Sequence, residues 1–242
     1  MENKLVREIN VPLSQSDNQG LMSTPGAFAL FMDMASEHAG YIGMGMDTIL
    51  EKGLIWLVSK TKLVIHRRPA MFSKVTVTTW PGEGVKARSN RYYKMEQDGQ
   101  LIMEAKNEWA IYHLETAKLK RMEEIYPPEL EILPDVVCDV PYLKLKDNFD
   151  DCEESSTYTV LSTDLDTSQH MNNVNYIKVV FGMFSSAQLA EMDIAEVDIS
   201  YKNQCYEGEL LTLKKKNVEN GFEIGIFKED GTRGALAKIA FR

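Results

Sequence analysis

The chain of 242 residues contains only three cysteines and four histidines, and both types are scattered. Cys138, Cys152 and Cys205 are odd in number and lack the paired spacing of zinc ligands, so we expect free thiols. The histidines show no HExxH or other metal-ligand spacing. GYIGMG, the stretch 40–45, has its glycines in the wrong order for a dinucleotide-binding turn. The sequence therefore predicts neither a bound metal ion nor a cofactor.

Long apolar runs are absent as well. No uninterrupted apolar run approaches the roughly 20 residues that a membrane-spanning helix needs. The N-terminal stretch MENKLVREINVPL lacks the apolar core of a signal peptide. With 44% hydrophobic and 26% charged residues, the composition is ordinary for a globular protein. We expect a cytoplasmic protein without a membrane span.

Hydrophobic periodicity predicts two series of elements in the same order. The first has a strand and a helix, then strands separated by the turns PGEG and QDGQ: 5–13, 24–46, 55–66, 74–82, 85–95 and 101–114. After a proline-rich stretch, a strand (157–162) precedes a helix (173–191), and four further strands reach Arg242.

Single residues repeat along with the elements, which favours an internal duplication. SDNQGLM (16–22) spaces Asp17 and Met22 as LDTSQHM (165–171) spaces Asp166 and Met171. PAMFSKV (69–75) aligns with QCYEGEL (204–210), although strands separated by Asp-Gly turns look alike in many antiparallel proteins. A long helix followed by an antiparallel meander buries its apolar face by lying across the sheet, which predicts an α+β double hotdog. We expect units at 1–125 and 151–242, with a linker at 126–150.

The stretch DLDTSQHMNNVNY (164–176) gathers polar residues at the expected start of the second helix. Asn172 and Asn173 suit helix capping, and Asp164 suits a turn or the surface. Asp166 and His170 could orient or activate a water, while the helix N-terminus could polarise a carbonyl. The first copy has Leu21 in place of His170, so the second copy is the better candidate for chemistry.

DLDTSQHMNNVNY resembles the signature of plant and bacterial acyl-ACP thioesterases, where ACP is acyl carrier protein. The stretches 53–84 and SYKNQC (200–205) resemble further segments of that family. The resemblance implies a hydrolase that releases free fatty acid from fatty acyl-ACP in fatty acid biosynthesis. It also implies that the first unit binds the acyl chain or carrier, and the second carries the catalytic motif. An acyl-CoA thioesterase, a hotdog hydratase or dehydratase, and a non-catalytic acyl-binding module remain alternatives.

The resemblance also implies roles for particular residues. Ser168 stands where plant members have Asn, and Gln204 stands where they have Glu. We expect Cys205 to lie near the site without being an obligatory nucleophile. The candidate catalytic residues are Asp166, Ser168, His170, Gln204 and Cys205. The candidate substrate-binding residues are Asn172 and Asn173.

Basic residues are concentrated between Ile55 and Met95, where nine Lys and Arg accompany one acid, although the chain's formal net charge is −9. Solvated strand faces would account for single cations, whereas the whole stretch favours docking of an acidic carrier protein. Nucleic acid is a poor candidate because no stacking motif or recognition helix accompanies the charges. The sequence leaves a homodimer open. The candidate carrier-docking residues are Arg67, Arg68, Arg88 and Arg91.

Overall fold

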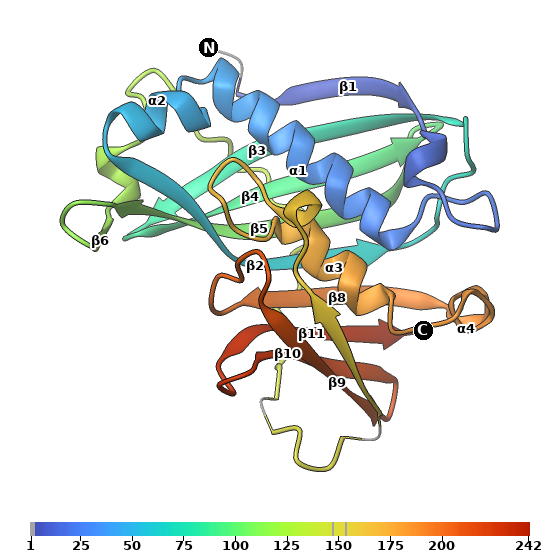
Figure 1. The fold of residues 1–242 in the computed structure, drawn as a ribbon. Coiled ribbons are helices and arrows are strands. Elements are labelled where there is room, and N and C mark those ends of the chain that lie inside the picture. The colour runs from blue at the N-terminus through green and yellow to red at the C-terminus, as the bar shows by residue number, and fades with distance from the viewer. Residues whose placement is uncertain (1–2, 147, 153) are drawn as a thin grey trace. The chain divides into compact units, whose positions relative to one another are not determined.

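The computed structural model describes residues 3–146, 148–152 and 154–242, and the chain divides into two compact units, Met1–Val140 (unit 1) and Pro141–Arg242 (unit 2). Each unit combines antiparallel strands with a few helices (Figure 1). The α+β class predicted from the sequence is therefore confirmed.

Unit 1 is built on strands that pair antiparallel. They are β1 Leu5–Asn10, β2 Leu54–Ile65, β3 Lys74–Val85, β4 Arg88–Gln97, β5 Gln100–His113 and β6 Lys118–Lys120. The order across the sheet is β1-β3-β4-β5-β2, and β6 pairs with β5. In β4, Ser89, Arg91, Tyr93 and Met95 are buried while their neighbours are more exposed. This period of two is expected where one face of a sheet covers a core.

The turns of unit 1 match the sequence in one place and differ in another. Asp98 and Gly99, with φ of 52° and 75°, form the expected two-residue turn between β4 and β5. The PGEG stretch (81–84) is not a turn but lies within β3, where the register against β4 shifts between Pro81 and Gly84. The shift is a bulge that bends the strand without reversing it.

The long helix of unit 1, α1 Thr24–Tyr41, lies across the sheet (Figure 1). Its N-terminus is capped by Ser23, whose Oγ accepts a 3.0 Å hydrogen bond from the amide of Gly26. The Phe31 ring packs 5.1 Å from the ring of Tyr93 in the sheet. The helix ends earlier than the predicted Met46, because Gly43 has a φ of 70° and α2 Met46–Glu51 then begins.

Unit 2 repeats the arrangement with fewer residues. Its elements are β7 Glu154–Thr159, α3 Asn173–Phe181, α4 Ser186–Glu191, β8 Ile194–Tyr201, β9 Leu210–Val218, β10 Gly221–Lys228 and β11 Arg233–Phe241. The strands pair antiparallel in the order β8-β11-β10-β9-β7. The four strands expected after the helix are confirmed.

The single helix predicted over 173–191 is wrong, because the structure has two helices there. α3 ends at Phe181, and α4 begins at Ser186 after a short turn. The Ser185 side chain accepts from the amide of Gln188, and the Gln188 side chain accepts from the amide of Ser185. This reciprocal capping box starts a new helix rather than continuing the old one.

Much of the stretch that the sequence assigns to a linker packs on unit 1. Leu130 belongs to a buried cluster with Ile49 and Ile111. The indole N–H of Trp80 donates to the backbone oxygen of Asp135 at 2.9 Å. The amide of Cys138 is hydrogen-bonded to the Glu104 carboxylate. Residues 126–140 are therefore part of unit 1.

The turn before α1 and the turn before α3 close the same backbone hydrogen bonds. The amide of Asp17 donates to the oxygen of Leu21 at 2.8 Å, and the amide of Asp166 donates to that of His170 at 2.9 Å. Met22 and Met171 then donate, at 2.9 and 2.8 Å, to the oxygens of Pro69 and Cys205. The equal spacing seen in the sequence thus corresponds to equal backbone structure.

These bonds correct the predicted alignment downstream by one residue. Pro69 corresponds to Cys205 rather than to Gln204. The amide of Phe72 donates at 2.9 Å to the oxygen of Val11, which follows β1, and the amide of Gly208 donates at 2.9 Å to the oxygen of Val160, which follows β7. These two bonds agree with the corrected alignment. The period of the strands alone could not reveal this offset, because only the loop bonds define it.

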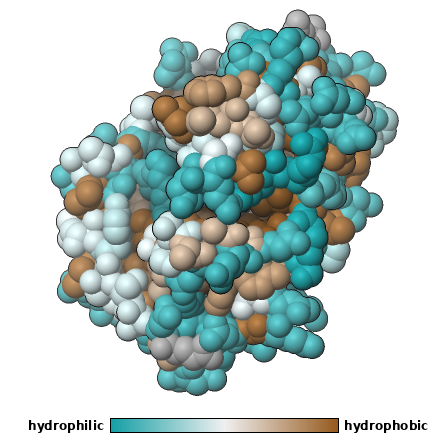
Figure 2. Space-filling view, turned by 90° about the vertical axis from the view of Figure 1, so that its right-hand side faces the viewer, coloured by the Kyte–Doolittle hydropathy of each residue, from teal (hydrophilic) through white to brown (hydrophobic). Residues whose placement is uncertain are grey.

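On the face shown in Figure 2, hydrophobic residues occur in small groups separated by hydrophilic ones. Scattered apolar residues of this kind are normal on a surface in contact with water. Within the described part of the chain, no helix is both long and apolar enough to cross a membrane.

Candidate active site

The residues 164–173 form a tight turn, here called the motif turn, which leads into α3. Besides the bond from Asp166 to His170, the amide of Gln169 donates to the Asp166 oxygen at 3.0 Å. The Asp166 carboxylate accepts from the amide of Ser168 through Oδ1 at 2.8 Å. Gln169 has a φ of 61°, a left-handed conformation that side chains other than glycine adopt at a cost. Within the motif turn, these hydrogen bonds hold the backbone of Asp166 close to the backbone of His170.

His170 is half-buried, and its ring packs edge-on against Tyr206 with 5.2 Å between ring centroids. Among the residues that the structure describes, its imidazole has no direct hydrogen bond to the Asp166 carboxylate. The two groups are close in the chain, but an intervening molecule such as a water would be needed to link them.

The N-terminus of α3 opens from the motif turn. The Asn172 side chain accepts from the amide of Val174 at 2.9 Å, and the Asn172 oxygen accepts from that of Asn175 at 2.8 Å. Capping by Asn172 is therefore confirmed. The amide of Asn173 has no acceptor among the described residues, so it is available to a ligand. The helix dipole adds a partial positive charge at this position.

Asp164 is buried and holds the motif turn in place through hydrogen bonds. Its side chain accepts 2.7 and 2.8 Å hydrogen bonds from the Tyr158 hydroxyl and the Leu161 amide. Its backbone oxygen accepts from the amide of Asn172 and the side-chain amide of Asn175. Burial, together with the hydrogen bond to Asp164, raises the pKa of Tyr158 to about 12. Asp164 is thus a turn residue, as expected, but it is buried rather than a surface acid.

The loop 204–206 lies beside the motif turn, because Met171 donates to the oxygen of Cys205. Cys205 is buried, and its amide donates to the Tyr176 hydroxyl at 3.1 Å. Burial raises the pKa of the Cys205 thiol, although its hydrogen bond with Tyr176 opposes the shift. A thiol with a raised pKa carries little nucleophilic thiolate at neutral pH. Gln204 is exposed, and its Oε1 accepts from the Tyr206 hydroxyl at 3.2 Å.

The turn before α1 differs in its side chains. Arg68 forms an ion pair with the Asp17 carboxylate and donates to Gln19 Oε1 at 2.7 Å. Leu21 occupies the position of His170 and forms a β-bridge with Ala70. An acid already paired with arginine, and a leucine in place of an imidazole, leave this turn without a base.

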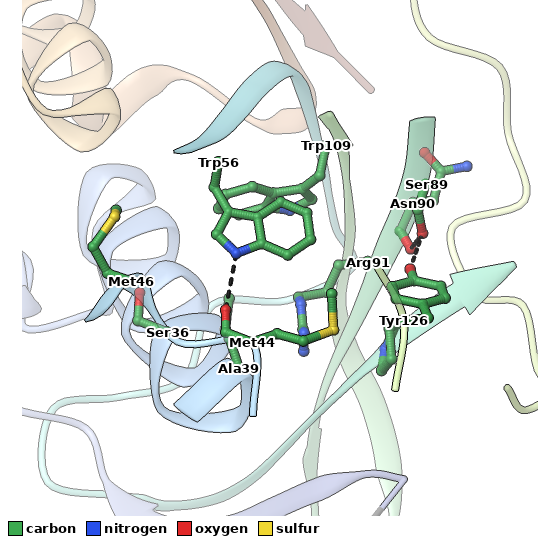
Figure 3. A pocket seen from close by; sticks show the side chains of 12 residues that line it. Ser36, Ala39, Met44, Met46, Trp56, Ser89, Asn90, Arg91, Trp109 and Tyr126 are labelled. Atoms are coloured by element: carbon green, nitrogen blue, oxygen red, sulfur yellow. Dashed lines mark hydrogen bonds between the residues drawn. The ribbon is translucent and has the colours of Figure 1, made fainter. Parts of the chain in front are cut away.

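Unit 1 contains a cavity of about 190 Å³ between α1 and the sheet (Figure 3). This exceeds the ~150 Å³ cavity known to admit benzene. The Trp56 and Trp109 rings meet edge-to-face at 5.7 Å, and the Trp56 indole N–H donates to the Met44 oxygen at 2.9 Å. The other lining residues are Ala35, Ser36, Ala39, Met46, Pro81, Ser89, Asn90, Arg91 and Tyr126.

The predicted docking surface is wrong for Arg91, which is only 8% exposed and lines this cavity. Its Nη1 donates to His38 Nδ1 at 2.9 Å, and burial lowers its pKa. Arg68 and Arg88 are exposed in part but form ion pairs with Asp17 and Glu108. Counting charges along 55–95 missed these acids, because the fold brings them from other segments. Arg67 is exposed and donates to Gln97.

Sequence reasoning missed three side chains of this region. Asn175 and Tyr176 bind the backbone of the motif turn and of Cys205, and Tyr206 contacts both His170 and Gln204. Tyr176 lies within the motif itself, whereas Tyr206 has no sequence signal that distinguishes it from a surface tyrosine. Across the described ranges, no group of three or more His, Cys, Asp or Glu side chains is arranged to hold a metal ion.

Models of one protein family match most of the chain, with one model in each unit. The model of the acyl-ACP thioesterase N-terminal domain matches residues 2–128, and that of the acyl-ACP thioesterase C-terminal domain matches residues 148–242. The chain belongs to the acyl-ACP thioesterase family.

Two of the curated relatives that the chain resembles come from plants. A chloroplastic palmitoyl-acyl carrier protein thioesterase of Gossypium hirsutum is 27% identical over 203 residues, which cover 78% of this chain and 49% of that protein. The chloroplastic oleoyl-acyl carrier protein thioesterase 2 of Arabidopsis thaliana is 24% identical over 228 residues, covering 85% and 60%. The chain thus spans about half the length of the first of these and three fifths of the second.

Solved structures resemble the whole chain. An acyl-ACP thioesterase from Bacteroides thetaiotaomicron has a TM-score of 0.90 at 20% identity, covering 99% of this chain and 98% of that one. The 12:0-ACP thioesterase from Umbellularia californica has a TM-score of 0.87 at 18% identity, covering 100% and 98%. At these identities the likeness concerns the fold.

Proposed function

We propose that this chain hydrolyses the thioester of fatty acyl-ACP, which releases free fatty acid and ACP. The observation that carries the proposal is the convergence of the motif turn, the start of α3 and the 204–206 loop in unit 2. In this proposal, His170 acts as the acid–base group and the Asn173 amide as a hydrogen-bond donor, and both belong to the segment that leads into α3. Family membership supports the same activity.

His170 is proposed as the general base. It takes a proton from a water held between its imidazole and the Asp166 carboxylate, and the water oxygen attacks the thioester carbonyl carbon. The developing oxyanion accepts a hydrogen bond from the Asn173 amide and is stabilised by the helix dipole. The C–S bond then breaks, and the proton on His170 passes to the departing thiolate. Free acid and thiol are the products.

Three candidates have supporting roles in this proposal. Cys205 shapes the wall of the site as a neutral thiol, because it is buried and its pKa is raised. Gln204 cannot accept a proton as a base, but its amide can orient a water or the oxyanion. The Ser168 amide holds the Asp166 carboxylate, and its hydroxyl is a candidate donor at the site.

The two units are proposed to be hotdog units with divided tasks. In unit 1 the cavity beneath α1 has the apolar rings and flexible thioethers that suit an acyl chain. In unit 2 the motif turn performs the chemistry. Asn172 and Asn173 serve the substrate through the shape and free amide of the helix start.

We propose ACP as the carrier, docked through Arg67, an exposed cation of unit 1 whose hydrogen-bond partner among the described residues is the neutral Gln97 side chain. Charge attraction of this kind is weakened by salt. The test is kcat/KM for one acyl chain on ACP and on CoA at low and high ionic strength, with Arg67→Glu. Lys118→Glu, an exposed reversal on β6, is the matched control. Salt-insensitive rates with no preference for ACP would reject docking and leave an acyl-CoA thioesterase.

The experiment for the activity itself is thiol release from a series of acyl-ACPs and acyl-CoAs by the purified chain. Hydrolysis predicts one thiol and one free acid per turnover. A hydratase or dehydratase would instead change the enoyl absorbance without releasing thiol. Binding of acyl chains without either product would assign the chain to non-catalytic acyl binding and reject the proposal.

A further inference from the structure

Tyr206 contacts two candidate site residues at once. Its ring meets the His170 ring at 5.2 Å with an interplanar angle of 66°, and its hydroxyl donates to Gln204 Oε1 at 3.2 Å. An edge-to-face pair restricts the rotation of the imidazole, and the hydrogen bond restricts that of the carboxamide. One side chain thus limits the freedom of both groups.

Two further side chains, those of Glu209 and Lys228, contact Tyr206. Its amide donates to Glu209 Oε2 at 2.9 Å, and Glu209 Oε1 accepts from Lys228 at 2.9 Å. The Lys228 ammonium lies 5.2 Å from the centroid of the Tyr206 ring. Lys228 is the last residue of β10, so a strand end contacts the ring through a cation–π interaction. Its ion pair with Glu209 holds the carboxylate that accepts from the Tyr206 backbone amide. These contacts hold Tyr206 in place although the residue is 46% exposed.

The hydrogen bond also determines which face of Gln204 remains available. Because Oε1 accepts from Tyr206, the carboxamide nitrogen with its two N–H donors points to the other side. A glutamine held in this way is a donor rather than an acceptor toward a substrate oxygen. Without the tyrosine hydroxyl, the carboxamide could turn over and present its oxygen, which would repel an oxyanion.

We propose that Tyr206 is a positioning residue for thioester hydrolysis, which orients the His170 imidazole and turns the N–H donors of Gln204 toward the substrate. The inference rests on the proposed hydrolase function. Unit 1 supports it by contrast, since Ala70 corresponds to Tyr206 in the corrected alignment and can supply neither contact.

The test uses Tyr206→Phe, which keeps the ring and removes the hydroxyl, and Tyr206→Leu, which removes both. Tyr206→Phe should lower kcat about three- to tenfold, the effect of one neutral hydrogen bond, with KM nearly unchanged. Tyr206→Leu should lower kcat further. Because the side chain is half exposed, both variants should keep the melting temperature of the parent.

A double-mutant cycle separates positioning from a general structural effect. In a Gln204→Leu background, which has no carboxamide to orient, Tyr206→Phe should lower kcat no further. Equal losses in both backgrounds would overturn the proposal. Lys118→Ala on β6 of unit 1 serves as the control that should leave kcat unchanged.

A spectroscopic readout tests the His170 contact without relying on activity. The ring-current shift of the His170 Hε1 and Hδ2 resonances should persist in Tyr206→Phe and disappear in Tyr206→Leu. Unchanged resonances in Tyr206→Leu would overturn the proposal. A parent chain that releases no thiol would instead reject the proposed function. An active parent with an additive cycle would reject the role of Tyr206 alone.

Discussion

The turn before α1 and the turn before α3 close matching backbone hydrogen bonds but carry different side chains. Both begin with an aspartate whose amide bonds four residues ahead, at Leu21 in one unit and at His170 in the other. In unit 1 the aspartate is ion-paired with Arg68. The residue corresponding to Arg68 in unit 2 is Gln204, which bonds to Tyr206 and leaves the second oxygen of Asp166 without a partner among the described residues.

Under the proposed function, this difference separates a turn that contributes stability from a turn that carries the chemistry. An aspartate paired with arginine contributes structure and has less acceptor capacity left for a water. An aspartate held by a single backbone amide keeps acceptor capacity beside a titratable imidazole. We therefore propose that the two turns share a backbone geometry and that their side chains determine which of them can react.

The same comparison explains the placement of two glycines. The left-handed position after the aspartate is Gly20 in unit 1 and Gln169 in unit 2, with φ of 70° and 61°. The left-handed position in the second loop is Phe72 in unit 1 and Gly208 in unit 2, with φ of 64° and 81°. At these two positions each unit thus has one glycine and one residue with a side chain in the left-handed region, and in unit 2 the latter residue adjoins His170.

Replacement of His170 by alanine should cause the largest loss of turnover. Loss of a positioned general base typically lowers turnover by about two orders of magnitude or more. His66→Ala, at an exposed histidine of unit 1, should retain full activity. Steady-state thiol release on one acyl-ACP measures both, and similar rates for both variants would contradict a base in unit 2.

Narrowing the unit 1 cavity should change chain selection rather than chemistry. Ala39→Phe projects a ring into the cavity, and each acyl methylene that no longer fits should lower kcat/KM about fourfold. Short chains should keep their rates. Gly40→Ala, where a Cβ would meet no atom within 4 Å, is the matched control. An unchanged chain-length profile in Ala39→Phe would place acyl binding elsewhere.

Cys205→Ala should keep measurable turnover, because a buried thiol with a raised pKa carries little nucleophilic thiolate at neutral pH. Thiol release on acyl-ACP checks this. An acyl group trapped on Cys205 and found by mass spectrometry would refute it.

The same variant tests the alkaline stability of unit 2. Burial raises the pKa of both Cys205 and Tyr176, so the unfolded chain releases these protons at lower pH than the folded chain. The contribution of Cys205 to the free energy of unfolding is therefore present below the ordinary thiol pKa of about 8.5 and is lost as the pH rises above it. The contribution of Tyr176 is lost only above the ordinary phenol pKa of about 10. Urea midpoints between pH 7 and 10 should fall less steeply in Cys205→Ala than in the parent.

Substitutions that exchange glycine and another residue at the left-handed positions 20 and 169 should have the smallest effect, a change in the free energy of unfolding. Gln169→Gly should raise the free energy of unfolding by on the order of 0.5 kcal/mol, because relief of the left-handed strain slightly exceeds the added entropy of the unfolded chain. Gly20→Ala should lower it by a similar amount. Urea denaturation of the two variants measures both, and a loss of stability in Gln169→Gly would show that the Gln169 side chain makes contacts that outweigh the strain.

The sequence predicted the elements of the fold because periodicity and turn residues are local signals. The strands of β4 and β5, and the Asp98-Gly99 turn between them, follow directly from alternation and a type of dipeptide that favours positive φ. Helix ends were less predictable, since the break after Phe181 depends on a capping box that competes with helix continuation. The bulge at Pro81 depends on pairing with β4, which no local pattern specifies.

The candidate site was predictable where its residues lie within one motif. Asn172 caps α3 as its residue type and position suggest. Tyr206 and the burial of Arg91 were not predictable, because both depend on which segments the fold brings together. A basic stretch counted along the chain likewise says little about a surface whose acids, such as Glu108, come from other strands.

The most direct test of the account compares Asp17→Ala with Asp166→Ala, two equivalent acids in two equivalent turns. The measurement is kcat/KM for hydrolysis of one acyl-ACP, with melting temperature recorded for each variant. Asp166→Ala should lower kcat/KM by about two orders of magnitude or more, because the water beside His170 loses its acceptor. Asp17→Ala should leave kcat/KM near the parent value and lower the melting temperature, since Arg68 loses its ion pair. Equal losses of activity from the two substitutions would contradict the assignment of the chemistry to unit 2.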